Sequence, residues 1–377
     1  MRILFLADLP RDPHSGAAGT ELQTVTALRA LGHEIDEVWR EDLPHRIAHW
    51  NLHYAFELPR AMRNAVARRL DRNYDAVHAN QPHAWMAAKL WRESGQRGVF
   101  VHRSHGFELH VEEVRRRWYR DEDRSPLRRA MSGFLAPLLV RNSRQIARWS
   151  DGHIVSASLD ADYLANRLRV PRERIAVIPQ GVSNEYLGKA APPLDGRRLK
   201  RVLHAAQFVA MKAPEVVAAA MRELARDAEL SLTWICSRQH HDAVRALLGN
   251  AAARVELLDW LPTEELIEVY DRHGIFLFPS YFEGFGKVFL EAMSRGLAVV
   301  ASDAGGMHDL IRSGGNGFLV PLGDAEAVVA RVRELLADPE RAARIGAAAA
   351  EEARAYTWER VARETASFYE RLREAKR

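Results

Sequence analysis

The chain has 377 residues, 47% of them apolar and 28% charged, so it is long enough for two domains and too apolar to be disordered. Its single cysteine, Cys236, excludes a disulfide framework or a cysteine-rich zinc site and favours a reducing compartment. The formal net charge of +4 gives no argument for a nucleic-acid partner, and no apolar run reaches the roughly 18 residues of a membrane span, so we expect a cytoplasmic protein.

Strand and helix patterns alternate through the first half of the chain. The apolar run Arg2–Asp8 leads into a polar stretch, Pro10–Gly19, which we expect to be a loop. Apolar residues then recur at helical spacing up to Gly32, a residue type that often ends helices. Further strands are predicted at Ile35–Trp39, Ala76–His78, Val99–His102, Ile154–Ser156 and Ile175–Pro179. Such alternation indicates a parallel, doubly wound sheet, whose ligands bind beyond the carboxyl ends of the strands.

The alternation is interrupted once and then begins again. The stretch 189–200 is polar, contains Pro192-Pro193 and has no periodicity, so we predict a linker between an N-terminal domain, 1–188, and a C-terminal domain, 201–356. Strands in the second domain are predicted at Val202–Ala206, Leu230–Cys236, Val255–Leu258, Ile275–Pro279, Val299–Ala301 and Phe318–Val320. A helical pattern then runs from Asp324 to the end. These patterns predict an α/β protein of two Rossmann-like domains.

The most informative stretch is residues 280–296, SYFEGFGKVFLEAMSRG. It follows a predicted strand and places Gly284 and Gly286 where a helix begins, so backbone amides there can approach a ligand closely. Glu283 lies in the loop, and Glu291 lies about two helical turns further on. Two carboxylates beside free amides suit the hydroxyl groups of a sugar better than a bare phosphate.

This stretch resembles the signature of glycosyltransferase family 4, the retaining, nucleotide-sugar-dependent enzymes of GT-B fold. Glu283 and Glu291 have the spacing of the family's two glutamates. The resemblance extends over nearly the whole chain, because 303–306 (DAGG) is similar to the family's second glycine loop and His105-Gly106 to its His-Gly pair. It implies two Rossmann-like domains whose parallel sheets face a central cleft, and a terminal helix, 357–377, that crosses back to the N-terminal domain.

The resemblance also implies roles for individual residues. Lys212 would neutralise the leaving diphosphate, Glu283 would hold the transferred sugar, and His105 would support the positive charge that develops on it. These three are the candidate catalytic residues, and Glu291 would bind the donor ribose. The candidate donor-binding set is Gly19, Gln207, Lys212, Trp260, Glu283, Gly284, Phe285, Gly286, Lys287, Val288 and Glu291, and the candidate acceptor-binding residues are Glu21 and His83.

Two positions depart from the family's pattern. Gln207 stands where the family usually has an arginine beside the diphosphate lysine, and glutamine donates hydrogen bonds without charge. Cys236-Ser237-Arg238 replaces a Gly-x-Gly loop that often lies near the nucleotide base. The sequence therefore does not identify the base of the nucleotide, and we expect UDP or GDP. No cofactor or metal is required.

Two groups of residues allow a metal-dependent alternative. Asp121-Glu122-Asp123 matches the D-x-D of metal-dependent transferases, but it follows an Arg-rich run and not a strand, which favours a solvated loop. His45, His49 and His53 repeat at helical spacing. Because no acid or cysteine clearly completes a metal site, a polar helix face or a wall of the acceptor site is favoured.

Two basic stretches allow peripheral contact with the inner face of a membrane. Residues 59–73 form a plausible amphipathic helix, and 112–149 contain ten Arg against five acids, with interspersed aromatic residues. Either could rest on an anionic membrane or bind a phosphorylated lipid. For 59–73 the pattern favours a solvated face whose apolar side packs on the sheet. For 112–149 the two interpretations are balanced.

The expected function is transfer of a sugar from a nucleoside-diphosphate sugar to an acceptor hydroxyl of a glycan, glycolipid or small glycoside, with polysaccharide assembly as a plausible setting. One alternative is a non-catalytic scaffold that binds nucleotide sugars, for which Gln207 is the warning sign. Another is an epimerase or hydrolase of the same fold, which needs no acceptor. A nicotinamide dehydrogenase is disfavoured, because neither half opens with G-x-G-x-x-G after its first strand.

Overall fold

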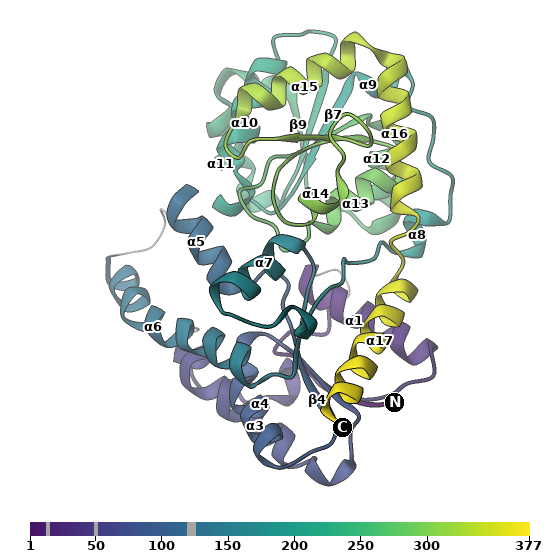
Figure 1. Ribbon diagram of the computed structural model, residues 1–377. Coiled ribbons are helices and arrows are strands. Elements are labelled where there is room, and N and C mark those ends of the chain that lie inside the picture. The colour runs from purple at the N-terminus through teal and green to yellow at the C-terminus, as the bar shows by residue number, and fades with distance from the viewer. Residues whose placement is uncertain (13–15, 49–51, 119–125) are drawn as a thin grey trace. The chain divides into compact units, whose positions relative to one another are not determined.

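The chain forms two compact α/β units (Figure 1). The computed structural model describes residues 1–12, 16–48, 52–118 and 126–377. The first unit comprises Met1–Glu113, Asp121–Gly181 and Trp358–Arg377, and the second comprises Val114–Arg120 and Val182–Thr357. The expected linker, 189–200, lies within the second unit.

The first unit is built on a six-stranded parallel sheet in the order β2-β1-β3-β4-β5-β6. Its strands are β1 (Arg2–Leu6), β2 (Glu34–Val38), β3 (Ala76–Asn80), β4 (Val99–Arg103), β5 (Gly152–Val155) and β6 (Ile175–Val177). All six were predicted from the sequence to within two residues at each end. In β1, Ile3 and Phe5 pack into one core and Leu4 and Leu6 into another, because side chains alternate between the two faces of a strand.

Helices cover both faces of this first sheet. On one face lie α1 (Gly16–Ala30) and α17 (Trp358–Lys376), which run side by side, and on the other lie α3 (Leu58–Ala67) and α4 (Trp85–Glu93) (Figure 1). The remaining helices are α5 (Glu108–Trp118), α6 (Pro126–Trp149) and α7 (Ser158–Arg167), with short turns η1 (Arg40–Asp42), η2 (His53–Glu57), η3 (Leu70–Arg72), η4 (Pro82–Ala84) and η5 (Arg172–Arg174).

The second unit repeats the plan with the strand order β12-β11-β10-β7-β8-β9, again all parallel. Its strands are β7 (Arg201–Ala205), β8 (Ser231–Ile235), β9 (Val255–Leu258), β10 (Ile275–Phe278), β11 (Ala298–Ser302) and β12 (Phe318–Val320). The predicted doubly wound architecture is therefore confirmed in both halves. Cys236 is buried just after β8, and burial raises the pKa of its thiol to about 11, in keeping with an inert core residue.

The helices of the second unit also lie on both faces of their sheet. One face is covered by α10 (Pro214–Leu224), α11 (His241–Leu248) and α15 (Ala325–Ala337), and the other by α12 (Thr263–Arg272), α13 (Lys287–Ser294), α14 (Gly305–Leu310) and α16 (Pro339–Ala353). Shorter elements are α8 (Asn184–Leu187), α9 (Gly196–Leu199), η6 (Ala210–Lys212), η7 (Arg238–His240) and η8 (Gly249–Arg254).

Two buried arginines hold the segment 189–200 against the second unit. Arg295 donates hydrogen bonds to the carbonyl oxygens of Lys189 and Ala190 and forms an ion pair with Asp271. Arg198 donates to the carbonyl oxygens of Pro192 and of Arg295 itself. Hydrogen bonds from charged donors stabilise a fold more than neutral ones do, so this proline-containing stretch is an ordered part of the unit.

Two expectations about local structure were wrong in detail. Gly19 lies in the first turns of α1 and not in a loop, because the helix already includes Gly16. The segment 44–48 is irregular, so His45 is not on a helix; the backbone amides of Arg46 and Ile47 donate to the Glu57 carboxylate instead. His49 and Asp121-Glu122-Asp123 lie outside the described residues.

The basic stretch 59–73 is helical only to Ala67, and its apolar side is not available to a membrane. Met62 and Val66 are fully buried in the core between α3 and the sheet. The packing interpretation of this stretch is therefore the one that the structure supports. Among the described helices, none is both long enough and apolar enough to cross a membrane.

Four buried histidines predict that acid weakens the fold. Burial lowers the pKa of His83 and His153 to about 3 and that of His204 and His273 to about 4, from an ordinary 6.5. On acidification the unfolded chain binds protons at these histidines that the folded chain does not bind. Their contribution to the free energy of unfolding is therefore fully present above about pH 6.5 and is lost as the pH falls towards 4. Each histidine contributes up to about 1.4 kcal/mol per pH unit in that window. Urea unfolding should show a lower midpoint at pH 5 than at pH 7, and equal midpoints would contradict this.

Candidate active site

In the second unit, Lys212 and Glu283 meet beyond the carboxyl ends of two neighbouring strands. Lys212 ends the turn η6 after β7, and Glu283 follows β10, which pairs with β7. The ammonium Nζ lies 2.6 and 2.8 Å from the two carboxylate oxygens of Glu283, so it bonds both. The Lys212 side chain is 17% exposed and that of Glu283 is 6% exposed. The structure thus brings together two of the three predicted catalytic residues.

The loop that carries Glu283 is shaped by glycines on two segments. Gly286 has φ = +95° and is the cap of α13, so the helix begins at Lys287 with its first amides unpaired within the helix. Gly305 has φ = +50°, and a Cβ there would lie 2.1 Å from the backbone oxygen of Glu283. Gly306 donates its backbone N–H to the carbonyl oxygen of Phe285. The predicted second glycine loop therefore packs directly against the Glu283 loop.

Glu291 lies on α13 and is nearly buried. Burial raises the pKa of its carboxyl, opposed by the charge of Lys287 and by hydrogen bonds from the hydroxyls of Tyr270 and Tyr186. Hydroxyl groups already solvate this carboxylate, so its surroundings suit a ligand that presents further hydroxyls. Nothing in the sequence pointed to Tyr186 or Tyr270, because both are contributed by segments distant from the motif.

The other predicted donor-binding residues of this unit differ in their surroundings. Gly284 and Phe285 are buried beside Glu283, while Lys287 and Val288 open α13 and are half-buried. Gln207 is exposed in the loop after β7. Trp260 is 46% exposed and lies just beyond the end of β9. Its position is that of a residue available to a ligand and not of a core residue.

In the first unit, a buried glutamate organises the predicted histidine. Glu21 of α1 lies 2.7 Å from Nε2 of His105, which follows β4, and accepts a hydrogen bond from the Asn80 amide at 3.0 Å. Nδ1 of His105 lies 3.5 Å from the amide nitrogen of Gln180. These partners select the tautomer in which Nε2 carries the proton and donates it to Glu21, and Nδ1 is left as an acceptor.

Hydrogen-bond donors and positive charge around Glu21 keep it ionised although it is buried. Burial opposes its ionisation, but His78 and His105 outweigh that effect, and the pKa of Glu21 is well below its ordinary value. Arg103 at the end of β4 is fully buried, with Nε 3.7 Å from Glu21. Among the described residues its guanidinium has no hydrogen-bond acceptor, so Glu21 is the carboxylate that balances it. Glu21, which was expected to bind the acceptor, is thus engaged with protein groups.

His83 and Gly19 also lie in this unit. His83 lies in η4, just after β3, and is buried. Its ring stacks on the Tyr54 ring, with the ring centroids 4.5 Å apart and an interplanar angle of 7°. Gly19 lies two residues before Glu21 on α1. The sequence analysis missed Asn80 and Arg103, which end β3 and β4 just beyond the predicted strand ends. Strand ends of this kind are where doubly wound sheets carry their ligand-binding residues.

Two matches to protein families together cover nearly the whole chain. Residues 15–186 match the family described as Glycosyltransferase Family 4, and residues 195–352 match Glycosyl transferases group 1. The structure is similar over its full length to sucrose-phosphate synthase of Thermosynechococcus elongatus, with a TM-score of 0.76, 22% identity and 100% of both chains covered. HepE of Anabaena, solved in complex with UDP, has a TM-score of 0.67 and 18% identity over 97% of this chain and 99% of that one.

Curated relatives agree with these matches. The D-inositol 3-phosphate glycosyltransferase of Streptomyces scabiei is 29% identical over 328 residues, which are 79% of this chain and 68% of that protein. The protein of the same name from Streptomyces avermitilis is 29% identical over 261 residues, and the chain covers 55% of its length.

The fold and the paired Lys212–Glu283 site therefore define a two-domain protein of the GT-B class. Within that class, the chain belongs to the family 4 type of glycosyltransferases, as the motif around Glu283 and Glu291 indicated.

Proposed function

We propose that the protein is a retaining glycosyltransferase that moves a sugar from a nucleoside diphosphate to an acceptor hydroxyl. In the reaction, the bond between the anomeric carbon and the diphosphate oxygen breaks, and a bond from the acceptor oxygen to the same carbon forms. The acceptor's proton passes to the leaving phosphate, so no enzyme carboxylate becomes a nucleophile. The relatives named as glycosyltransferases support this class of reaction.

The observation that carries the proposal is the bidentate ion pair between Lys212 and Glu283. A diphosphate carries more negative charge than one carboxylate, so a bound donor would draw the ammonium away from Glu283. That exchange would leave Lys212 to stabilise the charge that grows on the leaving group. It would also free the Glu283 carboxylate to accept hydrogen bonds from the sugar's hydroxyls at the start of α13.

Glu291 and His105 would serve the other parts of the reaction. The carboxylate of Glu291, whose pKa the neighbouring Tyr270 and Tyr186 hydroxyls help to lower, would accept hydrogen bonds from the ribose hydroxyls of the nucleotide. Burial lowers the pKa of His105, against the opposing effect of Glu21, so the imidazole is neutral at pH 7. A neutral ring whose proton is held by Glu21 offers its remaining nitrogen and its backbone to an electron-poor sugar without adding positive charge.

Nucleotide binding tests the donor half of the proposal. Thermal unfolding would be followed with millimolar UDP, GDP, ADP, CMP and TDP, because the base is open. A nucleotide at 100 times its dissociation constant stabilises the folded state by about 2.7 kcal/mol. We expect one diphosphate to stabilise the protein, Glu291→Ala to abolish the effect, and Glu326→Ala, which removes an exposed glutamate on α15, to leave it unchanged. Stabilisation by none of the five would contradict the proposal.

Product analysis separates transfer from the alternatives. The diphosphate sugar with the identified base would be incubated with and without mixed acceptors that include sugars and inositol phosphates, and the product's anomeric configuration read by NMR. A new glycoside of unchanged configuration is expected. Release of free sugar or a changed donor without acceptor would favour a hydrolase or an epimerase, and binding without turnover would favour a scaffold.

A further inference from the structure

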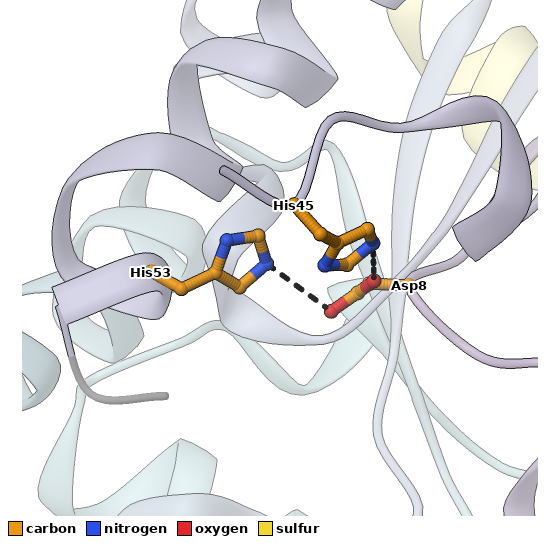
Figure 2. Close-up of side chains that lie close together, drawn as sticks. All are labelled: Asp8, His45 and His53. Atoms are coloured by element: carbon orange, nitrogen blue, oxygen red, sulfur yellow. Dashed lines mark ion pairs between the residues drawn. The ribbon is translucent and has the colours of Figure 1, made fainter. Parts of the chain in front are cut away.

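Asp8, His45 and His53 meet at the carboxyl end of β1 in the first unit, from three separate segments (Figure 2). Asp8 follows the strand, His45 lies in the irregular segment before residue 49, and His53 opens the turn η2. Nε2 of His45 is 3.2 Å from one carboxylate oxygen of Asp8, and Nε2 of His53 is 3.8 Å from the other. One ligand atom from each residue can be chosen so that all three lie within 4.8 Å of one another.

The spacing suits a small metal ion. Metal–ligand distances of about 2.0–2.1 Å in a tetrahedral site place neighbouring ligand atoms about 3.4 Å apart. The distances from the two histidines to Asp8, each to a different carboxylate oxygen, bracket that value, and the three ligand atoms lie within 4.8 Å of one another. Side-chain rotations would draw them together around an ion. Nε2 of His45, which lies 3.2 Å from the carbonyl oxygen of Arg40, would give up that contact to bind the ion.

A second carboxylate orients His53 towards the cluster. Nδ1 of His53 lies 2.8 Å from a carboxylate oxygen of Glu57, which also accepts from the backbone amides of Arg46 and Ile47. Bound in this way, Nδ1 carries the proton and Nε2 is left with a free lone pair that faces Asp8. A carboxylate that holds the far nitrogen of a histidine is the usual outer partner of a metal-binding imidazole. The turn η2, which begins at His53 and ends at Glu57, is π-helical, and turns of this kind occur frequently at functional sites.

Apart from the ion pairs within the cluster, its buried atoms lack hydrogen-bond partners in the described part of the chain. Asp8 is 3% exposed and His53 is 2% exposed. Neither carboxylate oxygen of Asp8, nor Nε2 of His53, makes a hydrogen bond there. A buried carboxylate with two unbonded oxygens calls for a cation.

We propose that Asp8, His45 and His53 bind one divalent transition-metal ion of the zinc type. Two imidazoles and one carboxylate are ligands that Zn²⁺ accepts and that Mg²⁺ binds poorly. Three protein ligands leave a fourth position for water or a ligand oxygen. Because His45 is exposed, that position opens towards solvent. The site does not depend on the proposed transferase reaction, and it replaces the expectation that these histidines form a polar helix face.

Zinc retention by the full chain, purified without a polyhistidine tag and stripped with chelator, tests the site. After dialysis against Zn²⁺ in the presence of a competing chelating dye, the wild-type protein should retain one tightly bound equivalent by mass spectrometry and unfold at a higher temperature. Mg²⁺ should cause neither change. Asp8→Asn and His45→Ala should each lose the equivalent, and Glu57→Gln should weaken binding about 10–100-fold through its loss of control over His53.

The matched control is His308→Gln. His308 and Asp303 form a His–Asp pair at 2.6 Å on the second unit, with no third ligand among the described residues, so this variant should keep the zinc. His45 is exposed, so its alanine variant remains informative even if Asp8→Asn does not fold. A wild-type protein that retains no zinc would overturn the proposal. Retention of the same equivalent with the same affinity by both His45→Ala and Glu57→Gln would overturn it as well.

Discussion

Replacement of Lys212 by methionine is expected to lower kcat for sugar transfer about 10²–10³-fold, the effect of removing one preorganised charge from a transition state. The ammonium is the group that would stabilise the leaving diphosphate, and the neighbouring Gln207 brings no charge that could replace it. The rate of nucleotide release with saturating donor and acceptor measures the effect. The matched control is Lys200→Met, which breaks an exposed Lys–Glu pair of the same unit and should leave the rate unchanged.

Loss of Lys212 also leaves Glu283 buried without its partner, which costs stability of about 3–5 kcal/mol by itself. The double variant Lys212→Met, Glu283→Gln removes both charges and should regain most of that stability in urea unfolding. Its transfer rate should stay as low as that of the single variant. Recovery of activity along with stability would show that Lys212 acts on the fold and not on the reaction.

Replacement of Gly305 by alanine is expected to destabilise the second unit by roughly 2–6 kcal/mol, since it combines backbone strain with overpacking. The residue has φ = +50°, and its new Cβ would lie 2.1 Å from the backbone oxygen of Glu283. Relief of that overlap must move the Glu283 loop, so nucleotide-dependent stabilisation should also be lost. Urea unfolding with and without the diphosphate that stabilises the wild-type protein measures both effects.

Gly196→Ala provides the control for this substitution. Gly196 begins α9 in the same unit, and an added Cβ there would meet no atom within 4 Å. Its unfolding midpoint should match that of the wild-type protein. An unchanged midpoint for Gly305→Ala as well would show that the glycine loop can move aside and does not support the Glu283 loop.

The strands and the donor motif were predictable because their signals are local. Most strands of the two sheets are short apolar runs such as Ile275–Phe278, which is buried on both faces between helices, because burial on both faces selects continuous apolar residues. The two glutamates and two glycines of 283–291 are likewise visible without a structure, since their spacing and their place after a strand are properties of one segment.

Predictions of loops and of histidine clusters were less successful, again for a physical reason. The helical spacing of the histidines was misleading for His45, because the segment 44–48 begins at Pro44 and is irregular. The amides of Arg46 and Ile47 donate to the Glu57 side chain of η2 instead of to a helix. No pattern in 43–57 shows that Asp8 lies opposite these histidines. The acidic residue that completes the cluster is Asp8, which follows β1 and lies 37 positions before His45 in the chain.

The amino-acid sequence by itself determined the two α/β halves, the family motif and the identity of the charged groups in it, since apolar periodicity and segment composition are properties of neighbouring residues. Only the tertiary structure decided which of those groups meet. Lys212 bonds Glu283, 71 positions away, because β7 is paired with β10, and Glu21 holds His105 because α1 and β4 bring them together. Strand order and loop conformation follow from packing across the whole unit, and packing across a unit leaves no local signal in the chain.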